Sequence, residues 1–463
     1  MRRTILAFSA LALAAGCDPG DFGAALDKAP VRFIGAPSSF GSDVGRTLLP
    51  LDPPAGQPKV AARLLFAGVD TPSLAVADFD GNGKPRVQTA TSAELGKLGL
   101  SQGGISSAAW LVAPPATGSA ALGMIVLGTP GGAAPGPAGG VAFLNLVADS
   151  GGKLAFETAR VFFEPGPAGH FGLAVASGRV TQAVADEAIV VSDSDVHVLR
   201  FPVGAPVDDV VSAKTCAVAL QTPPDLHRSL AVASFLSFDT QQIAVGLPVE
   251  GGIGKVVILQ YGLNPASGAV ELFCTSLPGL SVPSGSNPPG FGTALAAVPD
   301  MNGDHLAELV VGAPPDQAYL FYSPFDGSKQ PTVFTNGDPN SEFGQRVAVV
   351  HIGPPNDSSP NGTPELAITA LQADVGSTKK AGEVLVYSLD GDGTTPIATV
   401  YDSTPTANTE FFGIGLAALE FNSGRACAKG NDVHLLVAGA DTGIFTFFAF
   451  PGSQPDPRCF AQK

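Results

Sequence analysis

The chain has 463 residues, a net charge of −16 and 45% apolar residues, which is enough apolar material for one large domain or several smaller ones. The negative charge argues against a nucleic-acid-binding protein, because an acidic surface repels phosphate groups. With 57 glycines and 41 prolines, turns should be frequent and long helices are not expected.

The N-terminus has the features of an export signal. Arg2 and Arg3 precede the apolar run TILAFSALALA, which is followed by small residues up to Cys17. The run is too short to span a membrane, and the pattern predicts a secretory signal over residues 1–16. A cysteine directly after small residues resembles the lipobox of bacterial lipoproteins, although that family usually has leucine where this chain has Ala14.

The lipobox resemblance implies cleavage before Cys17 and attachment of lipid to that cysteine. Residues 17–30 would then be a tether, and the protein would lie in the bacterial cell envelope, held to the inner or outer membrane through its lipid only. The alternative is an ordinary signal peptide with an incidental cysteine.

An internal repeat runs through the rest of the chain. The segments HFGLAVAS at 170–177 and HRSLAVAS at 227–234 align without gaps, and Phe-Gly or an equivalent pair opens similar segments elsewhere. After each opening come short apolar runs bounded by Gly, Pro, Asn and Asp, which is typical of β-strands. The seven openings lie near residues 40, 98, 171, 228, 291, 343 and 412.

Seven units of four strands predict an all-β fold, a seven-bladed β-propeller of four-stranded antiparallel blades over residues 31–450. The seventh unit lacks a fourth strand of its own, since the tail at 451–463 is polar and broken by proline. The strand-like segment VRFIG at 31–35 precedes the first opening. We expect it to pair into the last blade and close the ring, which removes exposed strand edges; the alternative is an unpaired leader.

Phe-Gly, an Asp-x-Asn-x-Asp loop and Val-Gly-Ala-Pro together resemble the FG-GAP repeats of the integrin α-subunit propeller. The resemblance extends over residues 30–450, is sharpest at 291–335 and is weak in the first two units. It implies a β-propeller in which a calcium-binding loop joins the first two strands of a blade.

The segment VPDMNGDHLAELVVGAP at 298–314 contains the best candidate for such a loop. Oxygen-bearing side chains alternate at Asp300, Asn302 and Asp304, and the Leu306 carbonyl and Glu308 continue the series. Ca²⁺ prefers six to eight oxygen ligands, and alternate residues of a tight loop can turn theirs inward together. These residues predict one structural calcium site, and the FG-GAP resemblance implies the same ligand role for each of them.

Two observations bear on this site. The resembling family often has glycine where this chain has His305, so we expect the turn to be strained and the site weakened. The loop is not an EF-hand, because strands rather than helices flank it and Val311 stands where an EF-hand has its last glutamate. The alternative is a polar turn closed by Asx hydrogen bonds.

A second acidic group occurs at Asp78, Asp80 and Asn82. Its spacing suits calcium, but its place in the repeat is the hairpin between third and fourth strands, and Arg86 stands where a ninth-position acid belongs. We therefore interpret it as a turn.

The cysteines are consistent with export to an oxidising compartment. Without Cys17, the chain keeps the even set Cys216, Cys274, Cys427 and Cys459. We expect Cys427 to pair with Cys459 and tether the C-terminal tail, which leaves Cys216 for Cys274. Four buried thiols are the alternative.

Two classes of function are compatible with this sequence. The first is a monomeric, non-catalytic binding, adhesion or scaffold module that recognises an unknown protein or glycan through long connections at 128–140 and 371–382, on the face opposite the calcium loop. The second is an enzyme, a secreted polysaccharide lyase or esterase with its site in the propeller channel. We expect the first, because the innermost strands are nearly all apolar.

Overall fold

The computed structural model describes part of the chain in detail. The described residues are 32–35, 45–51, 62–68, 73–79, 85–90, 92–97, 104–111, 121–130, 139–148, 154–163, 170–181, 185–193, 195–200, 208–212, 229–248, 254–275, 277, 280–282, 288, 290–350, 364–389, 393–402, 411–422, 432–440 and 443–449. Among them, no helix has the length and apolar character needed to cross a membrane.

The described strands form seven four-stranded antiparallel sheets. In the first six, strands that are consecutive in sequence are neighbours in the sheet. The first three sheets consist of β2 (Thr47–Pro50), β3 (Ala62–Gly68), β4 (Ser73–Phe79) and β5 (Pro85–Thr89); of β6 (Ser107–Leu111), β7 (Ala121–Thr129), β8 (Gly140–Ala148) and β9 (Leu154–Phe163); and of β10 (Ala174–Gly178), β11 (Glu187–Val191), β12 (Val196–Arg200) and β13 (Asp208–Ser212).

The next three sheets repeat this order. They consist of β14 (Leu230–Ala233), β15 (Gln242–Leu247), β16 (Lys255–Leu263) and β17 (Val270–Thr275); of β18 (Ala294–Val298), β19 (Glu308–Ala313), β20 (Gln317–Phe321) and β21 (Thr332–Thr335); and of β22 (Phe343–Val350), β23 (Glu365–Ala370), β24 (Glu383–Ser388) and β25 (Pro396–Val400). The short helix α2 (Ser92–Lys97) lies between the first and second sheets in sequence.

The seventh sheet combines strands from both ends of the chain. Its order is β1 (Arg32–Gly35), β28 (Gly443–Ala449), β27 (Asp432–Ala440) and β26 (Leu416–Asn422). Arg32 is opposite Thr446 and Gly35 is opposite Gly443. From the predicted segment at 31–35, the described residues of β1 therefore supply the fourth strand that the seventh unit lacks.

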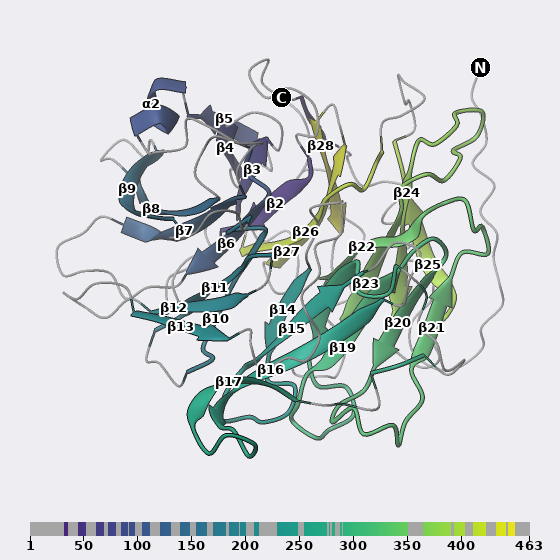
Figure 1. The fold of residues 1–463 in the computed structure, drawn as a ribbon. Coiled ribbons are helices and arrows are strands. Elements are labelled where there is room, and N and C mark those ends of the chain that lie inside the picture. Colours follow the sequence, from purple (N-terminus) through teal and green to yellow (C-terminus); the bar gives the residue numbers. More distant parts are fainter. Residues whose placement is uncertain are drawn as a thin grey trace.

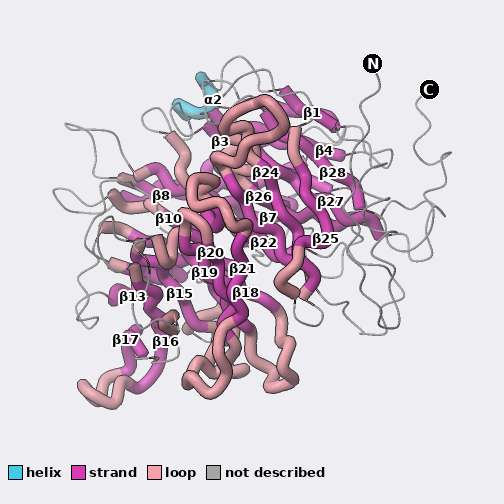
Figure 2. Tube along the Cα trace, turned by 90° about the vertical axis from the view of Figure 1, so that its right-hand side faces the viewer, coloured by secondary structure: helices cyan, strands magenta, loops and turns pink. Residues whose placement is uncertain are grey.

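The seven sheets follow one another around a ring (Figure 1). The first strand of each sheet contacts the first strand of the next, and β26 of the last sheet contacts β2 of the first. Figure 2 shows the same strands from the side, with loops at the ends of the sheets. The predicted all-β, seven-bladed propeller is confirmed.

The Phe-Gly pair has the same role in four sheets. Its phenylalanine is fully buried, at Phe171, Phe291, Phe343 and Phe412. Its glycine has a positive φ, of 92° at Gly172, 93° at Gly292, 96° at Gly344 and 92° at Gly413. A side chain is strained in that conformation, so the turn that aims each buried ring requires glycine.

The same glycine holds neighbouring sheets close together. A Cβ atom on Gly312 of β19 would lie 2.1 Å from the carbonyl oxygen of Gly344, which opens the next sheet. The corresponding distances are 2.2 Å from Gly128 to Gly172 and 2.0 Å from Gly246 to Gly292. Backbone atoms of adjacent blades therefore touch where each has a glycine, which explains why both glycines recur.

In the first sheet, Gly45 takes the position that Gly172, Gly292 and Gly344 have in their sheets. A Cβ atom on Gly439 of β27 would lie 2.0 Å from the carbonyl oxygen of Gly45. The contact that joins the last sheet to the first thus falls on Gly45, whereas Phe40 and Gly41 lie outside the described residues. The predicted opening at Leu98 also lies outside them.

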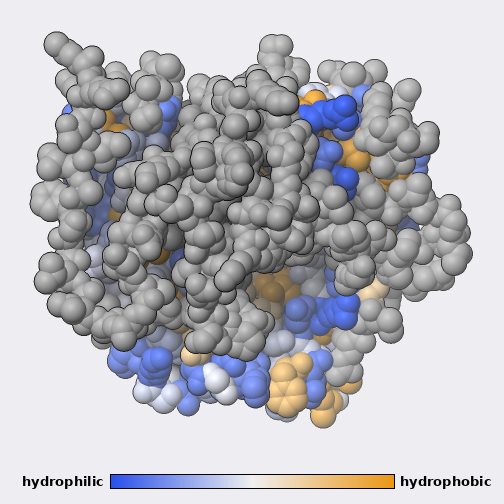
Figure 3. Space-filling model, turned by 180° about the vertical axis from the view of Figure 1, so that it is seen from behind, coloured by the Kyte–Doolittle hydropathy of each residue, from blue (hydrophilic) through white to orange (hydrophobic). Residues whose placement is uncertain are grey.

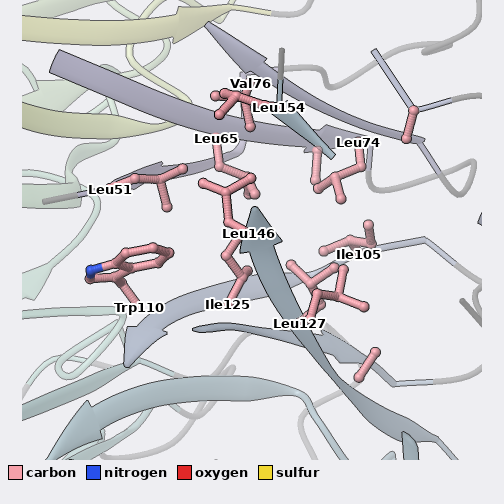
Figure 4. Packing of buried hydrophobic residues seen from close by; sticks show 14 of the residues in the cluster. Leu51, Leu65, Leu74, Val76, Ile105, Trp110, Ile125, Leu127, Leu146 and Leu154 are labelled. Carbon is pink, nitrogen blue, oxygen red and sulfur yellow. The ribbon is translucent and has the colours of Figure 1, made fainter. Parts of the chain in front are cut away.

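The hydrophobic core lies in layers between the sheets. One cluster joins the first two sheets through side chains such as Leu65, Val76, Ile125 and Leu146, all at most 1% exposed (Figure 4). Trp110 of β6 belongs to the same cluster. Each sheet packs one face against the preceding blade and the other face against the following blade. Both faces of its second and third strands are therefore apolar.

Sheet four has the most exposed apolar side chains among the described residues. Phe238 is 76% exposed, Leu263 66% and Val270 64%. Leu263 and Val270 are opposite each other at the tip of the β16–β17 hairpin, which projects from the body in Figures 1 and 2. Hydrophobic surface is visible at the lower right of Figure 3, where this hairpin lies.

Candidate metal centre

The candidate loop joins β18 to β19, the first and second strands of the fifth sheet. This is the connection in which the FG-GAP resemblance places a calcium loop. Val298, at the end of β18, is directly opposite Glu308, at the start of β19. The two strands therefore hold both ends of the loop in a fixed register.

Side chains within the loop bind its backbone. Asp300 Oδ1 accepts hydrogen bonds from the N–H groups of Asn302 (3.1 Å) and Gly303 (2.7 Å), and Oδ2 accepts one from His305 N–H (2.8 Å). Asp304 Oδ1 accepts the N–H of Leu306 at 2.8 Å. The Asx turns that were the alternative to a metal site are thus present, and they fold the loop so that its acids converge.

Three carboxylates meet inside this turn. Asp300, Asp304 and Glu308 each offer an oxygen atom within 4.8 Å of the other two, and they form the one such group of three among the described residues. Asn302 lies beside them, with its Nδ2 donating to Asp304 Oδ2 at 3.1 Å. The structure gives no ligand role to the Leu306 carbonyl, so the roles of Asn302 and Leu306 stay predictions.

Ser323, just after β20, completes the cluster from outside the loop. Its buried hydroxyl donates to Asp304 Oδ2 at 2.9 Å and is 3.3 Å from Glu308 Oε2. The Ser323 carbonyl accepts Asn302 Nδ2–H at 3.2 Å. Ser323 could not be predicted from the sequence, because a serine in another loop, 19 residues after Asp304, has no spacing signal that links it to the acids.

The environments of the carboxyl groups differ. Burial, together with the nearby charges of Asp304 and Asp300, raises the pKa of Glu308 to about 7. Burial also acts to raise the pKa of Asp300, but hydrogen bonds from Gly303, His305 and Asn302 outweigh it and hold that pKa below its usual range. The cluster thus concentrates negative charge around a buried carboxyl group, and a divalent cation would relieve the repulsion.

Other blades provide an internal comparison for Glu308. Glu187 and Gln242 are also the first residues of second strands and are also buried, each 1% exposed. Glu187 accepts N–H bonds from Val180 (2.7 Å) and Thr181 (2.8 Å), and Gln242 accepts one from Leu236 (2.7 Å). This position therefore fastens the preceding loop, and a neutral amide serves there as well.

Glu308 is bound more loosely than its counterparts. Its hydrogen bond from the Met301 N–H is 3.4 Å long, near the upper limit for such a bond. The carboxylate therefore keeps lone pairs for a metal ion, while the Asp300 and Asp304 carboxylates add hard oxygen donors of the kind that Ca²⁺ prefers. The residues present fit a calcium ion.

His305 has the strained conformation that the sequence predicts, with a φ of 67°. We expect His305→Gly to stabilise the protein by about 0.5–1 kcal/mol, since glycine adopts this conformation without the steric cost of a Cβ but loses more entropy on folding. Calcium affinity should rise in parallel, as read by thermal melting with and without Ca²⁺. Gly303→Ala, at a φ of 84°, should act in the opposite direction; if both variants melt like the wild type, the loop is not strained.

Of the second acidic group, the structure describes Asp78 alone. Asp78 lies at the end of β4, which pairs directly with β5, and its Oδ1 is 3.4 Å from Arg63 Nε of β3. Asp80 and Asn82 lie outside the described residues.

Most of the cysteines also lie outside the described residues, namely Cys17, Cys216, Cys427 and Cys459. Cys274 is in β17 and is not a free thiol. Its pairing with Cys216 stays a prediction.

Comparison with known proteins agrees with this geometry. The FG-GAP repeat model matches residues 291–322, a segment that contains the Phe-Gly pair, the acidic loop and β19 and β20. The match includes Asp300, Asp304 and Glu308 but not the other six units.

Two solved structures are similar over most of the chain. One is BBS1N, in its crystal structure in complex with ARL6DN soaked with lead, with a TM-score of 0.50, 10% sequence identity, and coverage of 91% of this chain and 97% of that chain. The other is a putative 6-phosphogluconolactonase from Bacteroides uniformis ATCC 8492, with a TM-score of 0.43, 12% identity, and coverage of 87% and 96%. The first likeness concerns the fold alone, and the second is too low to add to it. The chain is a seven-bladed β-propeller that contains an FG-GAP repeat at residues 291–322.

Proposed function

We propose that the protein is a non-catalytic binding or scaffold module of the bacterial cell envelope, anchored through lipid on Cys17, in which a structural Ca²⁺ fastens the β18–β19 loop. The observation that carries the metal assignment is the convergence of Asp300, Asp304 and Glu308 within 4.8 Å in the FG-GAP repeat. The loop lies at the end of a blade, so a metal there fixes a surface loop.

The magnitude of the effect favours a structural role for the ion. With about 1 mM calcium outside the cell and a dissociation constant of about 0.1–1 mM, binding would add only about 0.4–1.4 kcal/mol of stability. Such a site reinforces one loop of a ring that is already closed by packing. The ion would be held by the three carboxylates, with Ser323 orienting Asp304 through its hydroxyl.

The proposed partner is a protein or a glycan, and the proposed docking surface is the face opposite the metal loop. There the β23–β24 connection forms an ordered loop in which Lys379 Nζ is 2.5 Å from Asp374 Oδ2, and Asp374 Oδ1 accepts the Lys380 N–H at 3.0 Å. Loops held in one shape lose little entropy on binding. A glycan and surface-protein binding screen tests this part, and turnover of a polysaccharide or ester would favour the enzyme alternative instead.

Calcium titration with thermal melting tests the metal site. The wild-type melting temperature should rise with calcium and saturate, and the rise should disappear in the double variant Asp300→Ala, Asp304→Ala. Glu187→Gln is the matched control, because it changes an equivalent buried residue in a blade without the acidic trio and copies the amide at Gln242. This control should keep the full calcium response.

An unchanged melting temperature of the wild type in millimolar calcium would remove the metal assignment. The anchor is tested separately: mass spectrometry of the exported protein should find lipid on Cys17, and Cys17→Ser should release the protein from membranes. Unmodified Cys17 in the mature protein would contradict the anchor while leaving the metal site intact.

A further inference from the structure

An asparagine followed by a glycine is a chemically reactive pair, and one such pair lies inside the acidic loop. The described residues contain two of these pairs, at 302–303 and at 336–337. Asn302 and Gly303 are both exposed, and nothing stands within 4 Å of the position that a Cβ atom of Gly303 would take. Water therefore reaches this pair, and Gly303 offers its backbone nitrogen without a side chain in the way.

The reaction of such a pair is an internal attack followed by hydrolysis. The Gly303 nitrogen attacks Cγ of Asn302, so that a C–N bond forms and the Cγ–Nδ2 bond breaks. Nδ2 leaves as ammonia, together with the proton that the Gly303 nitrogen loses. Water then adds its hydroxyl group to one carbonyl of the cyclic imide and returns a proton to the Gly303 nitrogen. Breaking the new bond gives aspartate at position 302, whereas breaking the original peptide bond gives isoaspartate.

Hydrogen bonds in the loop polarise both groups that react. Asn302 Oδ1 accepts the Asp304 N–H at 2.9 Å, which draws electrons away from Cγ. The Gly303 N–H donates to Asp300 Oδ1 at 2.7 Å. A charged acceptor polarises an N–H group more strongly than a neutral one, so the Gly303 nitrogen becomes the better nucleophile.

The second pair lacks these features. The Gly337 N–H donates to the neutral hydroxyl of Thr335 at 3.1 Å, and Asn336 is half-buried. Asn336 Nδ2 donates to the Ser341 hydroxyl at 2.7 Å, which holds the leaving group in place. We therefore expect the pair at 302–303 to react first.

Loss of the Asn302 amide changes the interactions inside the acidic loop. Nδ2 of Asn302 donates to Asp304 Oδ2 at 3.1 Å and to the Ser323 carbonyl oxygen at 3.2 Å. A carboxylate oxygen in place of this nitrogen accepts and cannot donate, so two attractive contacts become repulsive ones. A calcium ion among these oxygens would reverse the repulsion, because its affinity grows with the number of charged oxygen ligands.

We propose that Asn302 is a site of spontaneous deamidation, and that the aspartyl product binds calcium more tightly than the parent loop. The second part rests on the proposed calcium site, whereas the first does not. The isoaspartyl product adds the Cβ atom to the backbone path between Val298 and Glu308, which the two strands hold in register. That product should therefore lose the calcium response, and the metal dependence of this blade changes as the protein ages.

Peptide mapping by mass spectrometry tests the first part. The full-length exported protein is incubated in EDTA at mildly alkaline pH, and the mass gain from replacing an amide by a carboxyl group should appear at Asn302 before it appears at Asn336. Gly303→Ala should slow the reaction several-fold, because its methyl group hinders the attacking nitrogen. An Asn302 amide that survives as long as the Asn336 amide overturns the proposal.

Gly337→Ala is the matched control for the mapping experiment. Gly337 also has a positive φ, of 75°, and its Cβ position is equally open. This variant should slow the reaction at Asn336 and leave the rate at Asn302 unchanged. If it slows both sites alike, the effect of Gly303→Ala is not local and the assignment to this pair fails.

Calcium titration with thermal melting tests the second part. Asn302→Asp should melt below the wild type in EDTA, and its dissociation constant for calcium should be lower by about tenfold, since one more charged ligand faces the divalent ion. Asn336→Asp adds the same charge in another loop and should bind calcium like the wild type. Equal affinities for the two variants overturn the calcium part of the proposal.

The same titration separates this inference from the proposed function. A calcium response in Asn302→Asp but not in the wild type would show that the parent loop holds no ion, while the effect of deamidation stands. If neither protein responds, the metal site and the calcium part of this inference are both wrong. The mass gain at Asn302 is measured in EDTA and is decided independently of either result.

Discussion

Replacing Gly312 with alanine is expected to destabilise the propeller by about 3 kcal/mol, since the added methyl group overpacks a tight contact. The new Cβ would lie 2.1 Å from the Gly344 carbonyl oxygen and 3.1 Å from the Ala294 Cβ. A backbone oxygen cannot rotate away as a side chain can, so the fifth and sixth blades must move apart. Urea denaturation or thermal melting of the purified protein measures the loss.

Gly262→Ala is the matched control for this prediction. Gly262 also lies within a strand, β16, but nothing stands within 4 Å of the position that its Cβ would take. Alanine there should leave stability unchanged or raise it by about 0.4–1 kcal/mol, because it restricts the unfolded chain. If the two variants unfold at the same denaturant concentration, contact between glycines does not fix the spacing of the blades.

The stability of the metal-free protein is expected to fall as the pH rises from about 4.5 to about 7.5. In the folded state Glu308 has a pKa of about 7, against an ordinary value of 4.5 for a glutamate. The folded state therefore binds more protons than the unfolded state between these values, and its advantage is lost as the pH rises through 7. At 1.4 kcal/mol per pKa unit, the loss attributable to Glu308 is at most about 3 kcal/mol.

Glu308→Gln isolates this effect, because the amide cannot ionise. Burial also raises the pKa of Glu383, but Glu383 is present in both proteins and cancels in the comparison. The variant should lose less stability between pH 5 and pH 8 than the wild type in EDTA. At pH 8 calcium should restore the wild type and not the variant; equal pH slopes for the two proteins would show that Glu308 ionises normally.

The fold could be predicted from the sequence because its signals are local and repeated. Short apolar runs between turn residues mark the strands, and seven copies reinforce one another. The predicted role of VRFIG follows from counting strands, and β1 does pair with β28. The acidic trio was also predictable, since Asp300, Asp304 and Glu308 lie close together in the chain and one turn brings them together.

Strand register could not be predicted in the same way. The segments 170–177 and 227–234 align without gaps in sequence, yet Gly178 is opposite Glu187 whereas Ala233 is opposite Gln242. The two first strands are thus shifted by two residues relative to their second strands. A shift of two keeps every side chain on the same face, so the hydrophobic pattern is the same for both registers.

Contacts between segments that are distant in the chain could not be predicted from the sequence either. Ser323 reaches the acidic loop only because β20 ends beside it. Gly45 was missed because Phe40-Gly41 offers a better match to the motif a few residues earlier.

Contact between glycine backbones has a consequence for how the sequence of such a propeller can evolve. The spacing between Gly312 and Gly344 depends on main-chain atoms alone, so it is indifferent to the side chains that the loops display. The loops of one blade can therefore gain or lose ligand residues without disturbing the packing of the neighbouring blades. A family of such proteins can diversify one blade at a time, and among the described residues an acidic trio that could hold an ion occurs in the fifth blade alone.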